Sequence, residues 1–303
     1  MARSHPPSLT TIVRRTLLEE CGPLVGRSVL AAVSGGSDSQ AMLSVLGRLA
    51  PKVGFTLLAH GVDHGLRAEA ARELDLAEAL AGKLGIPFGR TLLALGRGGN
   101  LQARAREARY AALRAVAASH AALLATAHHA DDRAETVLLR LLRGAGPRGL
   151  AVLEPRAHDV IRPLIRASKS DVRLHLERHC LDFAEDPSNQ NPAFLRVRVR
   201  HELLPTLVHL SPQIVRHLNA LADALSGADL PELARRGQSP DGAELNRAQI
   251  RELLRASRLG RSVTIRVSSG RDIVVRPPGK GGVGAPPTNA NDFLRTSGRD
   301  KNS

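Results

Sequence analysis

Apolar positions in the first half of this 303-residue chain alternate between two periods. Short apolar runs of strand character are separated by longer segments in which apolar residues recur every three to four positions, as in an amphipathic helix. The runs predict strands at residues 29–33, 55–60, 88–95, 121–127 and 160–165. The longer segments predict helices at residues 9–20, 69–84, 101–119 and 131–143, with others after residue 39 and after Ser168 as N-cap. This alternation predicts an α/β fold, a doubly wound and mostly parallel sheet with helices on both faces.

The pattern changes beyond His201, where helical spacing continues without strands and Pro205 and Pro212 interrupt it. An apparent hairpin follows at residues 263–275, around a Ser-Gly pair. We therefore expect an N-terminal domain at residues 1–213 and a smaller, mainly helical C-terminal domain at residues 214–276. Gly, Pro, Asn and charged residues dominate residues 277–303, which predicts a disordered tail.

The charge balance changes this picture, because 43 Lys and Arg stand against 29 Asp and Glu and leave a net charge of +14. Such an excess favours a polyanionic partner, since basic side chains neutralise phosphates and release their counterions. Nucleic acid is the leading candidate, and a merely solubilising surface charge is the alternative. The two cysteines, Cys21 and Cys180, form neither a disulfide framework nor a CxxC motif and are expected to be inert, buried thiols.

The chain contains no run of 18 apolar residues, and its N-terminus lacks the apolar core of a secretory signal. The sequence therefore predicts a cytoplasmic protein without membrane association. It leaves the oligomeric state open, a homodimer included.

A glycine-containing turn, SGGSDS at residues 34–39, lies between the first predicted strand of the sheet and the following helix. Gly35 and Gly36 would let the backbone approach a phosphate closely, and Asp38 would offer an oxygen to the Mg²⁺ of a nucleotide. The turn matches neither GxxxxGK[ST] nor GxGxxG, so kinases and Rossmann dehydrogenases are disfavoured. An ordinary connection rich in helix-capping residues is the alternative. The expected nucleotide-binding residues are Ser34, Gly35, Gly36, Ser37, Asp38 and Ser39.

Two basic segments are further candidates for phosphate contacts. His64 and Arg67 follow the second predicted strand, where the adenosine end of a nucleotide would lie in such a sheet, although a polar loop is an equal interpretation. Arg106 and Arg109 fall on one face of the helix at residues 101–119, which suits a polyanion. A solvated helix face is the alternative for this pair.

An acidic cluster opens the helix after the fourth predicted strand, in the sequence TAHHADDRAET at residues 126–136. Asp132 and Glu135 share one helical face, with His128 one turn before them. Paired carboxylates beside a histidine would hold an ammonium group and help to remove a proton from an amine that becomes a nucleophile. Helix capping and metal binding are the alternatives, and capping is as consistent with the residues as a functional role.

The glycine turn looks like the SGGxDS loop of the N-type ATP pyrophosphatases, which release pyrophosphate and leave an adenylated intermediate. Over roughly residues 25–215 the chain resembles the tRNA(Ile)-lysidine synthetase family of that superfamily, whose fold is of the adenine nucleotide alpha hydrolase type. The resemblance rests on the motifs SGGSDS, VDHGLR, NLQARAREARY, ATAHHADDRAETVLLRLLRG, RPLI and EDPSNQNPAFLRVRVRHELLP. It implies that ATP adenylates the wobble cytidine of a tRNA(Ile) with a CAU anticodon, and that free L-lysine then displaces AMP.

The resemblance also implies roles for residues. Asp132 and Glu135 would contact lysine, and Asp38 would assist the Mg²⁺. The family pattern Arg-Asn-Arg-aliphatic-Arg is altered here, because Val197 replaces the Asn. The three arginines of this segment are expected to line the RNA or ATP site, with an exposed stripe that binds nothing as the alternative. They are Arg196, Arg198 and Arg200.

Two other functions stay open. A tRNA thiolase of the same superfamily would activate a base with a similar loop, but such enzymes resemble cysteine-dependent or iron–sulfur systems, and Cys21 and Cys180 are isolated. A nucleotide-binding RNA-interaction module without turnover is the second, and the retained acidic residues argue against it.

Overall fold

The computed structural model describes residues 7–63, 65, 69–93, 101–184 and 194–226, together with short stretches between residues 248 and 275. The chain divides into two compact units, Met1–Asp223 and Ala224–Ser303. The sequence-based boundary after residue 213 precedes this division, because the last helix of the first unit begins at Ile214. The predicted tail, residues 277–303, lies outside the described residues.

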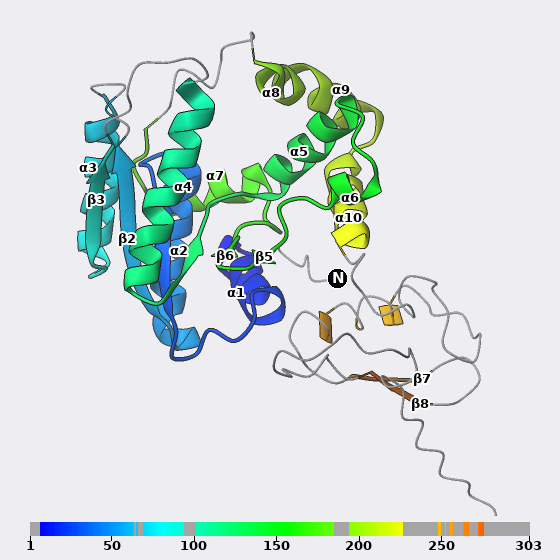
Figure 1. Cartoon of the computed structure of the whole chain (residues 1–303), viewed down its shortest axis with the longest axis horizontal. Coiled ribbons are helices and arrows are strands. Elements are labelled where there is room, and N and C mark those ends of the chain that lie inside the picture. Colours follow the sequence, from blue (N-terminus) through cyan, green and yellow to red (C-terminus); the bar gives the residue numbers. More distant parts are fainter. Residues whose placement is uncertain are drawn as a thin grey trace, which may run out of the picture. The chain divides into compact units, whose positions relative to one another are not determined.

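The first unit is built on a six-stranded sheet with the order β3-β2-β1-β4-β6-β5. All neighbouring strands are parallel except β5 and β6. The predicted α/β fold with a mostly parallel sheet is therefore confirmed (Figure 1). The strands are β1 Ser28–Val33, β2 Thr56–Asp63, β3 Phe88–Leu92, β4 Ala122–Ala125, β5 Arg156–Ala157 and β6 Val160–Ile161.

Helices cover both faces of this sheet, because its strands are apolar on both sides. In β1, Val29, Ala31 and Val33 belong to one core, whereas Leu30 belongs to the other. The first core is completed by residues of α1, α2, α3 and α7, and the second by residues of α4. The helices of this unit are α1 Leu9–Glu20, α2 Ser37–Val53, α3 Glu69–Lys83, α4 Leu101–Ser119, α5 Ala130–Leu142, α6 Pro147–Leu150, α7 Lys169–Arg178, α8 Leu195–Arg198, α9 Leu204–Leu210 and α10 Ile214–Ser226. A π-helix, Val199–Leu203, joins α8 to α9.

The strand order reverses between β1 and β4. From β1 the chain moves outward through β2 to β3, and it then returns through α4 to place β4 on the other side of β1. The loops that leave the carboxyl ends of β1 and β4 therefore run in opposite directions, which opens a crevice at this edge of the sheet. These two loops carry the predicted phosphate turn and the predicted acidic cluster.

The strand predicted at residues 160–165 is shorter than expected. It ends at Ile161, because Pro163 has no N–H to donate and residues 162–165 form a turn, closed by the Ile165 N–H donating to the Arg162 carbonyl at 3.1 Å. The two-residue β5 and the single-turn α6 were not predicted, because both are too short for a periodic signal.

In the second unit, β7 Val263–Arg266 and β8 Asp272–Val275 form an antiparallel pair, with Val263 opposite Val275, as the predicted hairpin requires. Within the described residues, no helix is both long and apolar enough to cross a membrane.

Candidate active site at the carboxyl ends of β1 and β4

The turn after β1 is held by the side chain of Ser39. Its Oγ accepts a hydrogen bond from the Ser34 N–H at 3.2 Å and donates to the Gly36 carbonyl at 2.9 Å. Helix α2 begins at Ser37, so its first backbone N–H groups have no partner within the helix and, together with the helix dipole, suit an anion.

Gly35 is required in this turn for two independent reasons. Its φ of +77° lies in the left-handed region that disfavours side chains. A Cβ at this position would also lie 2.0 Å from the backbone carbonyl oxygen of Glu73 in α3. The close approach of α3 to the turn therefore depends on the absence of a side chain.

The turn lines a cleft of about 1090 Å³. The cleft is walled by apolar side chains of β2, α3 and α4, including Val62, Leu74 and Leu113. Of the residues predicted from the sequence, those that line it are Ser34, Gly36, Ser37, Asp38, Ser39, Arg109, His128 and Arg200. A volume of this size, part apolar and part charged, accommodates a nucleotide.

Asp38, in the first turn of α2, is contacted by two cationic or ionisable groups from distant parts of the chain. The Lys169 Nζ donates to Asp38 Oδ1 at 2.6 Å and to the Ser37 hydroxyl at 3.0 Å. The His129 Nε2 lies 3.7 Å from Asp38 Oδ2. Lys169 begins α7, and its backbone N–H donates to Asp131 at 2.8 Å, which ties α7 to α5. The turn at residues 34–39 contains no lysine, and Lys169 of α7 supplies one.

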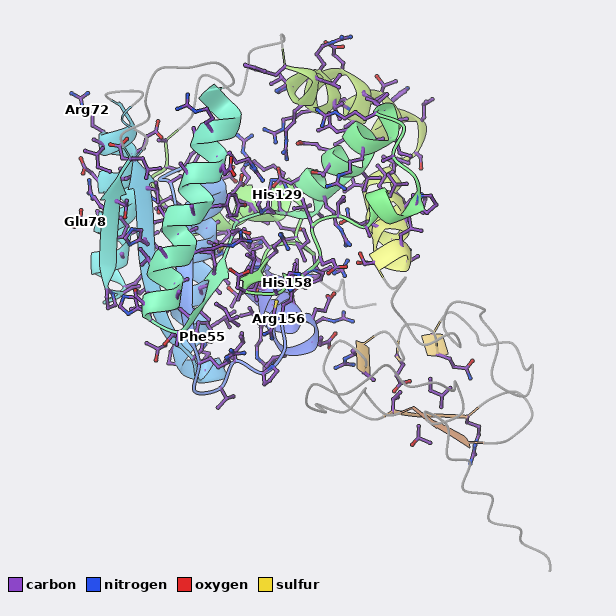
Figure 2. All side chains as sticks on the ribbon, viewed as in Figure 1. Phe55, Arg72, Glu78, His129, Arg156 and His158 are labelled. Carbon is purple, nitrogen blue, oxygen red and sulfur yellow. The ribbon has the colours of Figure 1, made fainter. Side chains whose placement is uncertain are left out.

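His129 is the N-cap of α5 (Figure 2). Its backbone N–H donates to Asp132 Oδ2 at 3.1 Å, and the Asp132 N–H lies 3.4 Å from His129 Nδ1, which makes a reciprocal capping box. Burial works to lower the pKa of His129, but the surrounding carboxylates of Asp131, Asp132 and Asp38 outweigh it and raise that pKa above its ordinary value. His129 therefore links the phosphate turn to the helix of the acidic cluster.

The pKa of His128 is shifted in the opposite direction to that of His129. Its Nδ1 lies 3.0 Å from the Thr126 hydroxyl, and burial lowers the pKa of the imidazole to about 4, although Asp132 acts in the other direction. His128 is consequently neutral at pH 7 and lines the cleft as a hydrogen-bond acceptor or donor without charge.

The acidic pair is not among the residues that line the cleft, and two of the predicted arginines bind it, forming a clamp. Arg200 donates to Glu135 Oε1 at 2.6 Å and to Asp132 Oδ1 at 3.3 Å. Arg196 donates to Glu135 Oε2 at 3.0 Å and to Asp132 Oδ1 at 3.2 Å. Both carboxylates are buried, Glu135 with only 2% of its surface exposed, so the two guanidinium groups supply the positive charge that burial of two anions demands.

Arg198 does not join this clamp. It is exposed and pairs with Glu202, one turn further along the helix, at 3.3 Å. The clamp is instead made by residues 196 and 200, and the π-helix that begins at Val199 carries Arg200. Such π-helical turns occur often at functional sites.

The remaining predicted residues are distributed as follows. Arg109 reaches the cleft, where burial lowers the pKa of its guanidinium. Its neighbour Arg106 lies over the ring of Tyr110, with 5.2 Å between the guanidinium carbon and the ring centre. His64 and Arg67 lie outside the described residues.

Comparison with known proteins gives the family of the chain. A model of the PP-loop domain matches residues 9–207. The tRNA(Ile)-lysidine synthase of Thermobifida fusca is 39% identical over 226 residues, which cover 73% of this chain and 70% of that protein. The chain belongs to the tRNA(Ile)-lysidine synthase family.

Relatives in this family differ in length. The tRNA(Ile)-lysidine synthase of Pseudomonas aeruginosa is 40% identical over 211 residues, which cover 67% of this chain but 47% of that protein. The chain thus spans most of one relative and about half of another. As a member of the PP-loop family, it uses ATP.

Among solved structures, the U34-tRNA thiolase NcsA from Methanococcus maripaludis, determined with its [4Fe-4S] cluster, has the same fold. It superposes with a TM-score of 0.63 at 21% identity, covering 73% of this chain and 79% of that one. At this identity the likeness concerns the fold and carries no information about the reaction.

Two residues that contact Asp38 in the candidate site, Lys169 and His129, were not assigned from the sequence. A signal for His129 was present, since it adjoins His128 at the start of α5. The sequence did not distinguish a helix-capping role of His129 from a contact with Asp38. Lys169 is 131 residues from Asp38 in the sequence, and only the packing of α7 against α2 brings it to the turn.

Proposed function

We propose that this chain ligates lysine to the wobble cytidine of tRNA(Ile) with a CAU anticodon and so forms lysidine. The ring carbonyl oxygen of the cytidine attacks the α-phosphorus of ATP, and pyrophosphate leaves. The ε-amine of free L-lysine then attacks the activated ring carbon, loses a proton, and AMP leaves with the former carbonyl oxygen. The observation that supports this most is that the phosphate turn after β1 and His128 after β4 line one cleft, while the next residue, His129, contacts both Asp38 of the turn and Asp132 of the acidic pair.

The phosphate turn is suited to the first step. Ser37, Ser39 and the N-terminus of α2 would hold the polyphosphate. Lys169 would exchange its contact with Asp38 for a contact with the departing pyrophosphate. Arg109, which also lines the cleft, would add a second positive charge. Together these groups would stabilise the negative charge that develops as pyrophosphate leaves.

A magnesium ion fits beside Asp38. This carboxylate is partly exposed to the cleft and adjoins the serine hydroxyls of the turn. Mg²⁺ is commonly bound by one or two carboxylates, water and the substrate's own phosphates, which is what this position offers. Bound there, the ion would supply positive charge to the phosphates.

The acidic pair is suited to a cationic amino acid. Asp132 and Glu135 would bind an ammonium group of lysine, and neutral His128 would accept a hydrogen bond from the attacking amine. Because Arg196 and Arg200 hold the same carboxylates, lysine would have to displace or share these contacts. The net charge of +14 and the C-terminal segment from residue 214 to 276 would serve recognition of the tRNA.

Thiolation of tRNA is the weaker alternative. Burial raises the pKa of the Cys21 thiol to about 12, so this cysteine is not a thiolate at neutral pH, and its Sγ lies 3.6 Å from the Pro155 carbonyl oxygen. Cys180 is exposed just after the end of α7, so the expectation that both thiols are buried is wrong for this residue. Neither thiol is placed as a sulfur carrier.

Incorporation of labelled lysine into a transcribed CAU-anticodon tRNA tests the proposal directly. The full chain should attach lysine and release AMP and pyrophosphate. Asp38→Ala should abolish pyrophosphate release, whereas Glu135→Gln should retain it and accumulate AMP-linked RNA, because the second step fails. Formation of ADP, sulfur-dependent modification, or tRNA binding without AMP release would each refute the proposed reaction.

A further inference from the structure

The face of α5 that points away from the acidic pair carries a fully buried arginine. Arg133 follows Asp132 directly, so its side chain projects about 100° around the helix axis from that carboxylate. None of its surface is exposed. Its Nε donates to the Val152 carbonyl at 2.8 Å, and its Nη1 donates to Asp223 Oδ1 at 2.6 Å. Because a guanidinium stays charged even when buried, α5 is tied to the anion that neutralises it.

A second contact from the same helix holds the beginning of α5. Asn219 is buried one turn before Asp223 on α10, and its Nδ2 donates to the Ala130 carbonyl at 2.8 Å. Ala130 is the first residue of α5. Asn219 and Asp223 are therefore fixed to α5 at points on either side of Asp132.

Asp223 is itself held from a third direction. Arg166 donates to its two oxygens at 2.6 and 3.0 Å, and also donates to Glu20 of α1 at 2.6–3.2 Å. Burial works to raise the pKa of Asp223, but Arg166 and Arg133 outweigh it and lower that pKa, so the carboxylate is ionised at neutral pH. This network fixes α10 against α1 as well as α5.

We propose that Asn219 and Asp223 are positioning residues for the amine site. They act through Ala130 and Arg133 to fix the rotation of α5 about its axis and its position along that axis. The orientation of α5 in turn sets the direction in which Asp132 and Glu135 present their carboxylates. The inference rests on the proposed function, because it assigns the acidic pair to lysine. Neither residue lines the cleft.

Separate assays of the two steps test this. Asn219→Ala and Asp223→Asn are compared with His217→Ala, an exposed position on α10, in the full chain. Pyrophosphate release with tRNA and ATP but without lysine reports the first step, and lysidine formation at varied lysine concentration reports the second. Each variant should raise the KM for lysine about tenfold, as expected when one supporting hydrogen bond is lost, and leave pyrophosphate release within about twofold. His217→Ala should change neither.

If Asp223→Asn fails to fold, the double variant Arg133→Met with Asp223→Asn removes the buried charge as well as its partner. That protein should fold and still show the raised KM. Folded variants with an unchanged KM for lysine, or with both steps slowed equally, would overturn the inference and assign these residues a purely structural role. Absence of lysidine formation by the unaltered chain, measured first, would instead refute the proposed function.

Discussion

Replacing Lys169 by alanine tests whether the lysine that packs onto the phosphate turn takes part in the first chemical step. Its Nζ contacts Asp38 and the Ser37 hydroxyl, at 2.6 and 3.0 Å. With ATP bound, the same ammonium group would lie within reach of the departing pyrophosphate. Loss of this charge should slow pyrophosphate release without altering the use of lysine.

The magnitude follows from the exposure of the side chain and the charge of its partner. The Lys169 side chain is 49% exposed, so loss of its ion pair should change the free energy of unfolding by less than about 1 kcal/mol. A hydrogen bond to a charged group contributes about 1.5–3 kcal/mol. If the bond to pyrophosphate is made in the transition state, its loss corresponds to a rate about 10- to 150-fold lower.

Single-turnover pyrophosphate release with saturating ATP and tRNA measures this rate. Lys169→Arg should recover most of it, because the positive charge is kept, and Lys52→Ala, in the last turn of α2, serves as a matched control. Unchanged pyrophosphate release in Lys169→Ala, with normal folding, would show that the contact to Asp38 is only a surface ion pair.

Two further predictions concern the turn and the pH dependence of stability. Gly35→Ala should abolish pyrophosphate release and lower the melting temperature more than Gly26→Ala does. Gly26 shares the positive φ, but a Cβ there meets nothing within 4 Å. Equal shifts of the melting temperature in calorimetry would contradict this prediction. Burial lowers the pKa of His175 from 6.5 to about 4, so its contribution to stability is complete above pH 6.5 and falls by about 3 kcal/mol as the pH drops towards 4. In urea titrations, His175→Gln should reduce the loss of unfolding free energy at acidic pH, whereas His209→Gln, at an exposed position, should not. An unfolding free energy of His175→Gln that depends on pH as in the unaltered chain would refute this role of His175.

The fold was predictable because its signals are local. The strands β1, β2 and β4 are largely apolar, β3 adjoins the apolar residues Leu92–Leu95, and each helix from α1 to α5 is an amphipathic segment, so the alternation alone predicted a parallel sheet with helices on both faces. Helix α7 was predicted with Ser168 as its N-cap, and the Ser168 side chain does accept from the Asp171 N–H at 3.1 Å. The strand order beyond β4 was not visible, because β5 and β6 are two residues each and Pro163 stops the run.

Half of the site was predictable for the same reason. The turn at residues 34–39 and the cluster around Asp132 each lie within one short segment, directly after a strand, and parallel strands bring such segments to one edge. The clamp of Arg196 and Arg200 on the acidic pair was not predictable, because it depends on how α8 and the π-helix pack against α5. Arg198 is separated from its neighbours because residues two apart on a helix do not share a face, whereas Arg196 and Arg200, four apart, do.

At Asp132, the sequence left capping and function as alternatives, but the carboxylate has two oxygens and they face different partners. Oδ2 accepts the His129 backbone N–H and so fixes the first turn of α5, whereas Oδ1 faces Arg196 and Arg200. Glu135 has no part in the cap, and both of its oxygens meet the arginines. Because the cap holds Asp132 in one rotamer, Oδ1 is oriented before any substrate arrives, and Glu135 is left as the carboxylate whose charge can be removed without disturbing the cap.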